Sequence, residues 1–346
     1  MEEQIKYKIF VSTLLNSNGA NEASIAFKDV YKEFMNAIEG TEIELTPIKN
    51  TSDIWMRDYM PIQIDKKTFV TYYYQPDYLS CKERKHLITK RFASTAKIEE
   101  NRNKFWNENE SRLPFYAPNA VLRECRLVLD GGNVVVCGEK VILTDKVFIE
   151  NRPKSTDYVI GELKRAFGKE VIIIPSDPYE IDSARKENEL PLCHADGVLA
   201  PIDDKTILIA DYGNDPLGYV PQLMNALTPH FKPKNIKHFD FGEDWTEDAW
   251  IYINFLRIGD LVLMPTVNYI KKSKEEGNET TNLAYQEKLK RCNEKAKQQL
   301  KSFLGIDKIK AIDTTTLSLG KNKYGDEINP DNYGGALHCI TWEVTE

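Results

Sequence analysis

Five short stretches of this chain carry side chains that could do chemistry together, and each stretch lies at or near the start of a similar segment. In chain order they are Trp55-Met56-Arg57-Asp58, Asp130-Gly131-Gly132-Asn133, His194-Ala195-Asp196, Asn254, and Gly334-Gly335-Ala336-Leu337-His338-Cys339. They supply three or more carboxylates, an imidazole and a thiol. Gathered in one pocket, such groups would form a site in which a bound cation is attacked by a nucleophile.

Cys339, the thiol of the last stretch, has two ordinary interpretations. A cysteine is most often a small buried hydrophobe, whereas a cysteine that ionises is a nucleophile. Gly334 and Gly335 let the backbone pass where no side chain fits, and the apolar residues around Cys339 carry it into the fold. Taken alone, the stretch favours a buried, unreactive Cys339. The choice between the two interpretations therefore depends on which residues the rest of the chain brings near it.

The elements that must position these residues repeat along the chain. Alternating or continuous apolar runs with tight turns predict four β-hairpins, at 61–74, 133–144, 197–210 and 252–264. The first three hairpins follow one of the polar stretches, Asn254 lies within the first strand of the fourth, and the segment 335–344 would begin a fifth. Because the chain ends before a second strand, we expect this segment to pair with an N-terminal strand at 8–14.

Helices and single strands are predicted between the hairpins from apolar periodicity and from stop signals such as Gly40. The expected helices are 21–38, 158–167, 221–227 and 284–304, and the expected further strands are 42–48, 170–174, 236–239 and 309–312. Polar loops are expected at 99–112, 182–190, 271–282 and 321–333.

Internal repetition of one supersecondary unit favours a closed radial array over a doubly wound sheet. We therefore predict an α/β fold with five-fold pseudosymmetry, one ββαβ-type unit per blade, in a single domain spanning residues 1–346. Equivalent positions of the units would converge near the axis, which would bring the polar stretches together.

The bulk composition sets limits on function. The 346 residues are 41% hydrophobic and 29% charged, as in soluble globular proteins, and the net charge of −7 argues against nucleic acid or an anionic membrane as partner. The N-terminus does not show the pattern of a secretory signal, no apolar run approaches 18 residues, and the six cysteines form no CxxC pair. We expect a cytoplasmic protein with reduced thiols.

The four motifs Trp55–Asp58, Asp130–Asn133, His194–Asp196 and Gly334–Cys339, in this order, resemble those of the agmatine deiminase and Porphyromonas-type peptidylarginine deiminase family. The resemblance spans nearly the whole chain. It implies the fold of the guanidino-group-modifying enzymes, the pentein, which is a five-fold α/β-propeller.

The resemblance also implies a role for each polar residue. Cys339 would attack the guanidinium carbon, and His194 would protonate the departing ammonia and then activate water. Asp130 would orient His194, while Asp58 and Asp196 would bind the planar guanidinium.

Asn254, Trp55 and Gly335 are further predicted to belong to the substrate site, and the resemblance implies neither a cofactor nor a metal. Purely structural interpretations remain beside these roles. Asp58 could pair with Arg57, and Asp196 could form an Asx-type turn. Acidic residues near His194 and Cys339 could form a rim that attracts a dication: Glu180, Asp182, Glu187, Glu189, Asp326, Glu327 and Asp331.

The activity that the resemblance implies is hydrolysis of a C–N bond of a linear amidine. The expected substrate is a small cationic guanidino compound, with agmatine converted to N-carbamoylputrescine and ammonia as a step of putrescine and polyamine biosynthesis. The alternatives are a peptidylarginine deiminase, an amidinotransferase, a metal hydrolase using Cys193, His194 and Asp196, or a non-catalytic binding protein. A homo-oligomer is left open.

Overall fold

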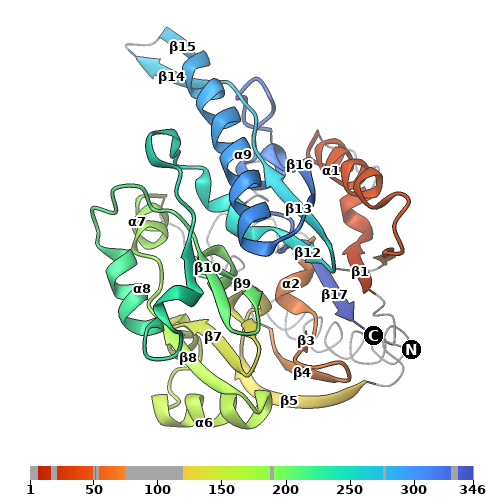
Figure 1. Ribbon diagram of the computed structural model, residues 1–346, viewed down its shortest axis with the longest axis vertical. Coiled ribbons are helices and arrows are strands. Elements are labelled where there is room, and N and C mark those ends of the chain that lie inside the picture. The colour runs from red at the N-terminus through yellow and green to blue at the C-terminus, as the bar shows by residue number, and fades with distance from the viewer. Residues whose placement is uncertain are drawn as a thin grey trace, which may run out of the picture. The chain divides into compact units, whose positions relative to one another are not determined.

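The computed structural model describes residues 7–16, 22–49, 51, 54–74, 120–187, 191–275, 278–328 and 334–345 (Figure 1). The chain divides into two compact units, which are described separately below. Unit 1 comprises residues 1–56, 208–214 and 237–345, and unit 2 comprises residues 57–207 and 215–236. The prediction of a single domain over 1–346 stays a prediction.

The sheets of unit 1 join strands from both ends of the chain. β1 (Tyr7–Ser12) lies antiparallel to β17 (Thr341–Thr345) and parallel to β2 (Glu44–Ile48). The predicted pairing of the last segment with the N-terminal strand is therefore confirmed. A second sheet places β12 (Leu256–Ile258) antiparallel to β13 (Leu261–Thr266), which is parallel to β16 (Lys308–Asp313).

The sheets of unit 2 follow the same plan. β3 (Ile62–Gln63) is antiparallel to β4 (Thr68–Tyr73), which runs parallel to β5 (Val121–Val128). β6 (Val135–Cys137) is antiparallel to β7 (Lys140–Thr144), which runs parallel to β8 (Glu170–Ile174).

A further three-stranded sheet contains β9 (Leu199–Asp203), β10 (Thr206–Ile209) and β11 (Ile236–His238), with β10 in the centre. The described residues thus contain the repeating strand unit that the sequence predicts, and the fold is α/β. The arrangement of five units around a common axis stays a prediction.

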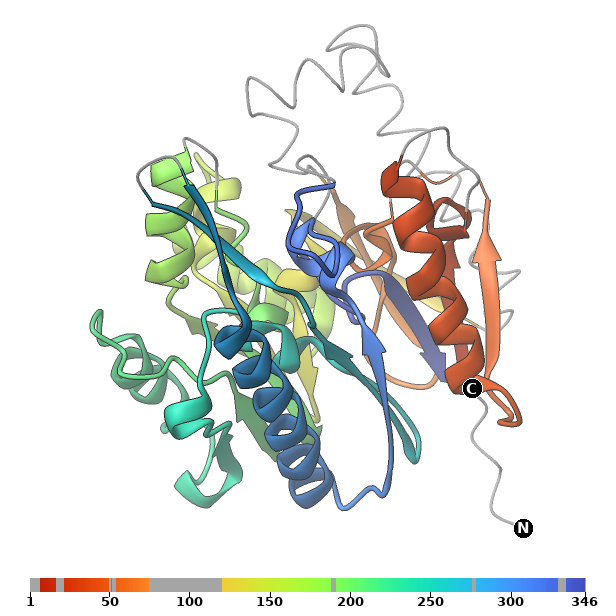
Figure 2. The ribbon, with the colours of Figure 1, turned by 90° about the horizontal axis from the view of Figure 1, so that it is seen from above.

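The helices between the strands largely match the expected ranges. The α-helices are α1 (Glu22–Ile38), α2 (Met56–Tyr59), α5 (Lys146–Glu150), α6 (Thr156–Phe167), α7 (Pro178–Glu187), α8 (Tyr219–Leu227), α9 (Leu283–Leu304) and α10 (Thr315–Leu319). The 3-10 helices are η1 (Thr13–Asn16), η3 (Gly131–Asn133), η4 (Ala195–Gly197), η5 (Pro233–Asn235), η6 (Gly242–Asp244) and η7 (Ala249–Asn254). Figure 2 shows the 22-residue α9, in blue, along its length. No described helix is long and apolar enough to cross a membrane.

The polar stretches differ from expectation in one systematic way. Strands were expected to begin at 133, 197 and 252, but each of these positions lies in a short 3-10 helix. The backbone N–H of Asn133 donates to the Asp130 carbonyl, and that of Gly197 donates to the His194 carbonyl. These local bonds satisfy buried backbone groups that would otherwise need a strand partner. The prediction that Asn254 lies in a strand is also wrong, since Asn254 is the last residue of η7.

Two predicted loops are also wrong. Within 271–282, β14 (Lys271–Glu275) and β15 (Asn278–Asn282) pair as antiparallel strands, and residues 182–187 belong to α7. The expected loop at 99–112 and the residues 188–190 lie outside the described residues.

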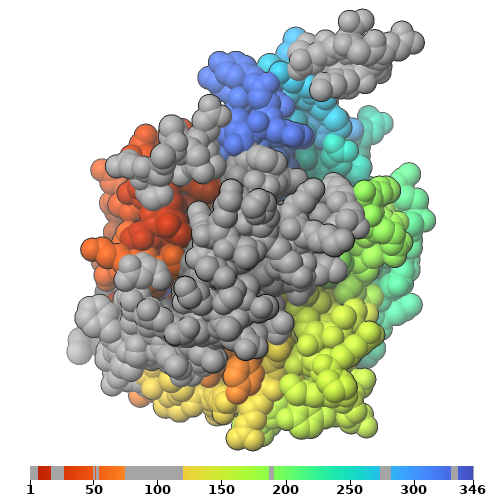
Figure 3. All heavy atoms as spheres, turned by 180° about the vertical axis from the view of Figure 1, so that it is seen from behind, coloured from red at the N-terminus to blue at the C-terminus, as the bar shows by residue number. Residues whose placement is uncertain are grey.

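Each unit has its own apolar core. The core of unit 1 includes Val11, Phe34, Leu263 and Leu337, and that of unit 2 includes Val70, Leu127, Val141, Leu143 and Leu163. Figure 3 shows the yellow-green part of unit 2, around α6, at the surface of the molecule. These cores hold the strand ends, and so the polar stretches that precede the strands, in fixed positions.

Trp342 of β17 is a core residue. It is 2% exposed, pairs in register with Phe10 of β1, and its ring centre lies 5.0 Å from that of Phe10 at an interplanar angle of 38°. It secures the strand that follows Cys339.

Candidate active site

Asp58 of unit 2 is fixed by hydrogen bonds to its backbone carbonyl and to one oxygen of its carboxylate. The Tyr72 hydroxyl, fully buried on β4, lies 2.7 Å from the Asp58 carbonyl oxygen and 3.1 Å from that of Met60, so it can donate to either. Asp58 Oδ1 accepts the backbone N–H of Gly132 at 3.0 Å. The short α2 turn therefore presents its carboxylate to the start of η3.

The imidazole of His194 lies between the carboxylates of Asp58 and Asp130. Its Nδ1 is 3.6 Å from Asp58 Oδ1, and its Nε2 is 3.1 Å from Asp130 Oδ2. The side chains of Asp58, Asp130 and His194 are 13%, 3% and 11% exposed, so water screens these interactions little. An imidazole in this position can hold a proton or pass it on.

Gly132 is the point at which three predicted site residues meet. A Cβ added to it would lie 2.7 Å from Asp58 Oδ1, 2.8 Å from His194 Nδ1 and 3.2 Å from Asp196 Oδ1. Only a residue without a side chain fits there. Asp58 from the first polar stretch and His194 and Asp196 from the third thus surround one glycine of the second.

Asn133 ties the second polar stretch to the third. Its side-chain Oδ1 accepts the backbone N–H of Thr144 at 3.0 Å and that of Ala195 at 3.2 Å, and the Thr144 hydroxyl lies 2.9 Å away. Asn133 is fully buried. Because these bonds connect η3, β7 and η4, they fix the Asp130 turn relative to the His194 turn.

Burial and charge shift the ionisation of this cluster. Burial raises the pKa of the Asp58 carboxyl to about 7, against the effect of His194 and with additional repulsion from Asp130 and Asp196. Burial alone would lower the pKa of His194, but Asp58 and Asp130 raise it to about 9 in spite of Lys146. Although burial opposes ionisation of Asp130, Lys146 and His194 hold its pKa well below the usual range. Asp130 is therefore an anion whenever His194 is charged.

Cys339 lies in unit 1, in a turn that spans Leu337–Ile340, and it is half-buried. Its backbone N–H donates to the Asn254 Oδ1 at 3.2 Å, and the His338 N–H donates to the Asn254 carbonyl at 3.2 Å. The segment 335–344 was expected to begin a hairpin, but residues 337–340 form a turn and β17 begins only at Thr341.

Trp55 and Gly335 lie beside this cysteine within unit 1. A Cβ on Gly335 would overlap the Trp55 ring and would come within 3.0 Å of the Cys339 Cβ. The glycine therefore allows the indole to approach the turn that carries Cys339. Asn254, Trp55, Gly335 and Cys339 form one group, as the sequence suggested.

The other described cysteines are buried, whereas Cys339 is half-buried. Burial raises the pKa of Cys125, Cys137 and Cys193 to about 12 and that of Cys292 to about 11. Such thiols stay protonated at neutral pH and are poor nucleophiles. Within the part of the chain that the structure describes, no group of three His, Cys, Asp or Glu side chains could hold a metal ion.

A model of the Porphyromonas-type peptidyl-arginine deiminase family matches residues 13–289 of the chain. This span includes strands β2 to β15 and the carboxylate–histidine cluster, and it ends before Cys339. The chain belongs to this family. A comparison with curated proteins gave no match.

Solved structures of agmatine deiminases have the same fold as this chain. Agmatine deiminase from C. jejuni is 13% identical with a TM-score of 0.57, over 99% of this chain and 97% of that chain. Agmatine deiminase of Enterococcus faecalis is 18% identical with a TM-score of 0.55, over 97% of this chain and 92% of that chain. At these identities the likeness shows a common fold.

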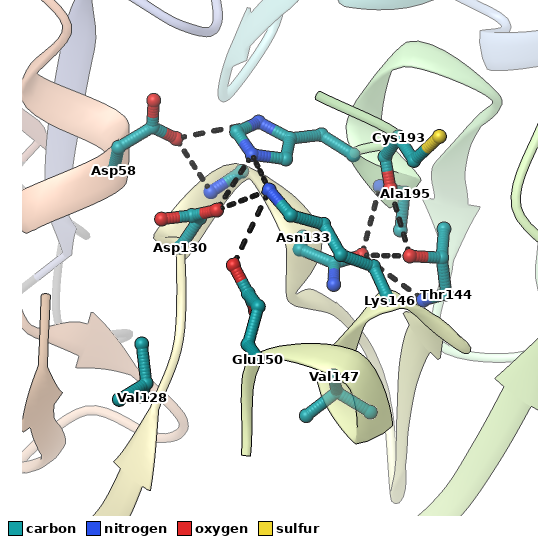
Figure 4. Close-up of polar contacts among 12 residues, drawn as sticks. Asp58, Val128, Asp130, Asn133, Thr144, Lys146, Val147, Glu150, Cys193 and Ala195 are labelled. Atoms are coloured by element: carbon teal, nitrogen blue, oxygen red, sulfur yellow. Dashed lines mark hydrogen bonds and ion pairs between the residues drawn. The ribbon is translucent and has the colours of Figure 1, made fainter. Parts of the chain in front are cut away.

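Two residues of this deiminase-family chain were missed in the sequence. Lys146 and Glu150 lie one helical turn apart on α5, and both point into the cluster in Figure 4. Their side chains are 7% and 6% exposed. The signal that could have revealed them was a charged i, i+4 pair inside an otherwise apolar segment directly after a buried strand.

The expected acidic rim is only partly supported. Asp182 pairs with Arg185 and Asp326 pairs with Lys272, while Glu180 Oε1 accepts the backbone N–H of Cys193 at 2.8 Å. Glu189 and Asp331 lie outside the described residues. Several of these acids are thus engaged within the protein.

Proposed function

We propose that this protein hydrolyses a guanidino substrate through a covalent intermediate on Cys339, with agmatine converted to N-carbamoylputrescine and ammonia. The observation that carries the proposal is the meeting of Asp58, His194 and Asp196 around Gly132. Membership of the deiminase family supports the reaction class. A cytoplasmic role in putrescine formation belongs to the same proposal.

The carboxylates suit the binding of a planar cation. A guanidinium loses its hydration on entering a buried site, and it regains bonding only from fixed acceptors with bidentate geometry. Asp58 and Asp196 are such acceptors in this proposal. Because a bound cation favours the anionic form of Asp58, binding would lower the raised pKa of this carboxyl.

The first half of the reaction forms a C–S bond and breaks a C–N bond. The Cys339 thiolate adds to the guanidinium carbon, and the tetrahedral adduct then expels one nitrogen as ammonia, to which the charged His194 gives a proton. A thiouronium ester on Cys339 remains. Asp130 keeps the imidazole oriented and stabilises its charge through Nε2.

The second half consumes water. The neutral His194 accepts one proton of a water molecule as the water oxygen adds to the same carbon. The C–S bond then breaks, the remaining hydroxyl proton of the adduct leaves to solvent, and the neutral ureido product and the thiolate are released. His194 ends the cycle charged, as it began. The scheme requires Cys339 and His194 to act on one substrate molecule, which is a prediction to be tested.

A panel of guanidino compounds with ammonia detection tests this proposal. Wild-type protein should release ammonia from at least one of agmatine, arginine and peptidyl-arginine, whereas Cys339→Ser and Asp58→Asn should lose more than about 1,000-fold in kcat/KM. Cys292→Ser, which changes a buried thiol of the same unit, is the matched control and should stay active. Absence of ammonia from every compound with folded wild-type protein would refute the proposal.

The second candidate is a peptidylarginine deiminase, which the name of the matching family model favours. It would use the same chemistry on an arginine side chain. Citrulline in a peptide substrate, without turnover of agmatine at matched concentration, would select it. An amidinotransferase would be recognised by adding an acceptor amine to the reaction. The acceptor would then become amidinated, and neither free ammonia nor the ureido product would form.

A further inference from the structure

The carboxylate–histidine cluster contains a buried cation that the reaction scheme does not use. Lys146 Nζ donates to Asp130 Oδ2 at 2.6 Å, lies 3.3 Å from Glu150 Oε1, and is 3.5 Å from His194 Nε2. The residue is 5% exposed. Burying an ammonium group costs folding free energy unless anions pair with it. The contacts of Lys146 with Asp130 and Glu150 supply that pairing.

We propose that Lys146 is a positioning residue of the deimination, whose ammonium holds Asp130 beside His194 and makes the imidazole release its proton more readily. The inference rests on the proposed function for its catalytic meaning. Its physical content, the effect of Lys146 on His194, can be tested without turnover.

Geometry gives Lys146 the means to hold Asp130. An aspartate has a short side chain, and a single oxygen, Oδ2, receives both Lys146 and His194. The second anion, Glu150, comes from the next turn of the same helix and keeps the ammonium at that end of the cluster. The lysine is thereby fixed between two carboxylates, and Asp130 is fixed by the lysine.

Carboxylates otherwise dominate the surroundings of His194. Asp58 of α2 faces Nδ1, Asp130 faces Nε2, Asp196 follows on the same η4 turn, and Glu180 of α7 contributes from the other side of Cys193. All of them favour the charged imidazole. Among the described residues around His194, Lys146 is the cation that opposes them.

This opposition has a chemical use. His194 has to donate a proton to ammonia and then accept one from water, and both steps are efficient only when its affinity for the proton is not extreme. Without Lys146, the acids around His194 would retain its proton more strongly. The second half of the reaction, which needs the neutral imidazole, would slow most.

An NMR titration of histidine-labelled protein tests the inference. The chain has five histidines, so the His194 signal is assigned by its loss in His194→Gln. Lys146→Met should move the His194 midpoint upward by about one pH unit or more, because a buried charge at this distance is weakly screened. Lys146→Arg, which keeps the charge, should return the midpoint most of the way to the wild-type value.

Lys164→Met is the matched control, since it removes an exposed lysine of α6 in the same unit. Its His194 midpoint should stay within a few tenths of a unit of wild type. If Lys146→Met does not fold, Glu150→Gln is tested instead. This substitution removes one of the two anions that neutralise the Lys146 ammonium, so the titration midpoint of His194 should move downward. An unchanged midpoint in folded Lys146→Met, or an unchanged or raised midpoint in Glu150→Gln, would overturn the inference.

Activity gives a separate readout. The alkaline limb of kcat/KM should follow the His194 midpoint upward in Lys146→Met, while kcat falls more than KM rises. Suppose that folded Lys146→Met shows the shifted His194 midpoint, but the wild-type protein turns over no guanidino compound. The electrostatic role of Lys146 would then stand, and the deiminase function would be rejected. The two claims thus fail in different ways.

Discussion

The substitution Gly132→Ala is a direct test of whether the cluster in unit 2 is catalytic. It adds one methyl group at the point where Asp58, His194 and Asp196 meet. The new Cβ would start 2.7 Å from Asp58 Oδ1 and 2.8 Å from His194 Nδ1, whereas ordinary contact begins at 3.4 Å. Those two groups would have to retreat by about 0.6–0.7 Å.

The consequence for activity should exceed the consequence for stability. A displacement approaching 1 Å at reacting groups costs roughly 100-fold in rate, whereas one extra methyl in a packed site costs about 1–3 kcal/mol of folding free energy. We therefore expect kcat/KM for the best guanidino substrate to fall about 100-fold in a protein that is still folded at 25 °C. Ammonia release and chemical denaturation measure the two quantities.

Gly161→Ala is the matched control. Gly161 lies inside α6, and a Cβ there would meet nothing within 4 Å. Alanine should stabilise the helix by about 0.5–1 kcal/mol and leave kcat/KM unchanged. If Gly132→Ala kept wild-type kcat/KM, the close packing of the three groups would have no catalytic meaning and the reasoning would be refuted.

Three further outcomes are expected. With increasing pH, kcat/KM should rise as Asp58 ionises near its pKa of about 7 and fall as His194 loses its proton near its pKa of about 9. Ammonia release measured at fixed times across the pH range tests this. A maximum of kcat/KM below pH 6 would contradict the assignment. Asn133→Ala leaves the buried N–H groups of Thr144 and Ala195 without their acceptor and should cost about 2–4 kcal/mol in urea denaturation, whereas a cost below 1 kcal/mol would show that they find other partners. Trp342→Ala should cost about 3–5 kcal/mol by the same measurement, and a near-neutral effect would deny its place in the core.

The sequence predicted the repeating hairpins because buried strands leave a strong apolar pattern. It also predicted the pairing of 341–345 with the first strand, since an unfinished repeat at one end needs a partner at the other. The helices after these hairpins were found from their 3.6-residue periodicity. Boundaries were less accurate where polar, solvated strands such as β14 and β15 carry no such pattern.

Details of the site were harder to predict for physical reasons. The turns that end at Asn133 and Gly197 look like strand starts in the sequence, because the local N–H to carbonyl bonds that form them do not change the hydrophobic pattern. Lys146 was not singled out in the sequence, since its burial depends on contacts with Asp130 and Glu150 that form only in the folded protein. Motif spacing located the groups that react, but not the charges that tune them.

Mass spectrometry of an acid-quenched reaction tests the central claim most directly. Trypsin releases the C-terminal peptide 324–346, in which Cys339 is the only cysteine. During steady-state turnover of the best guanidino substrate, this peptide should carry the mass of the substrate less ammonia, and the adduct should disappear when the substrate is exhausted. Undiminished ammonia release by Cys339→Ala, with no adduct on the wild-type peptide, would contradict the account.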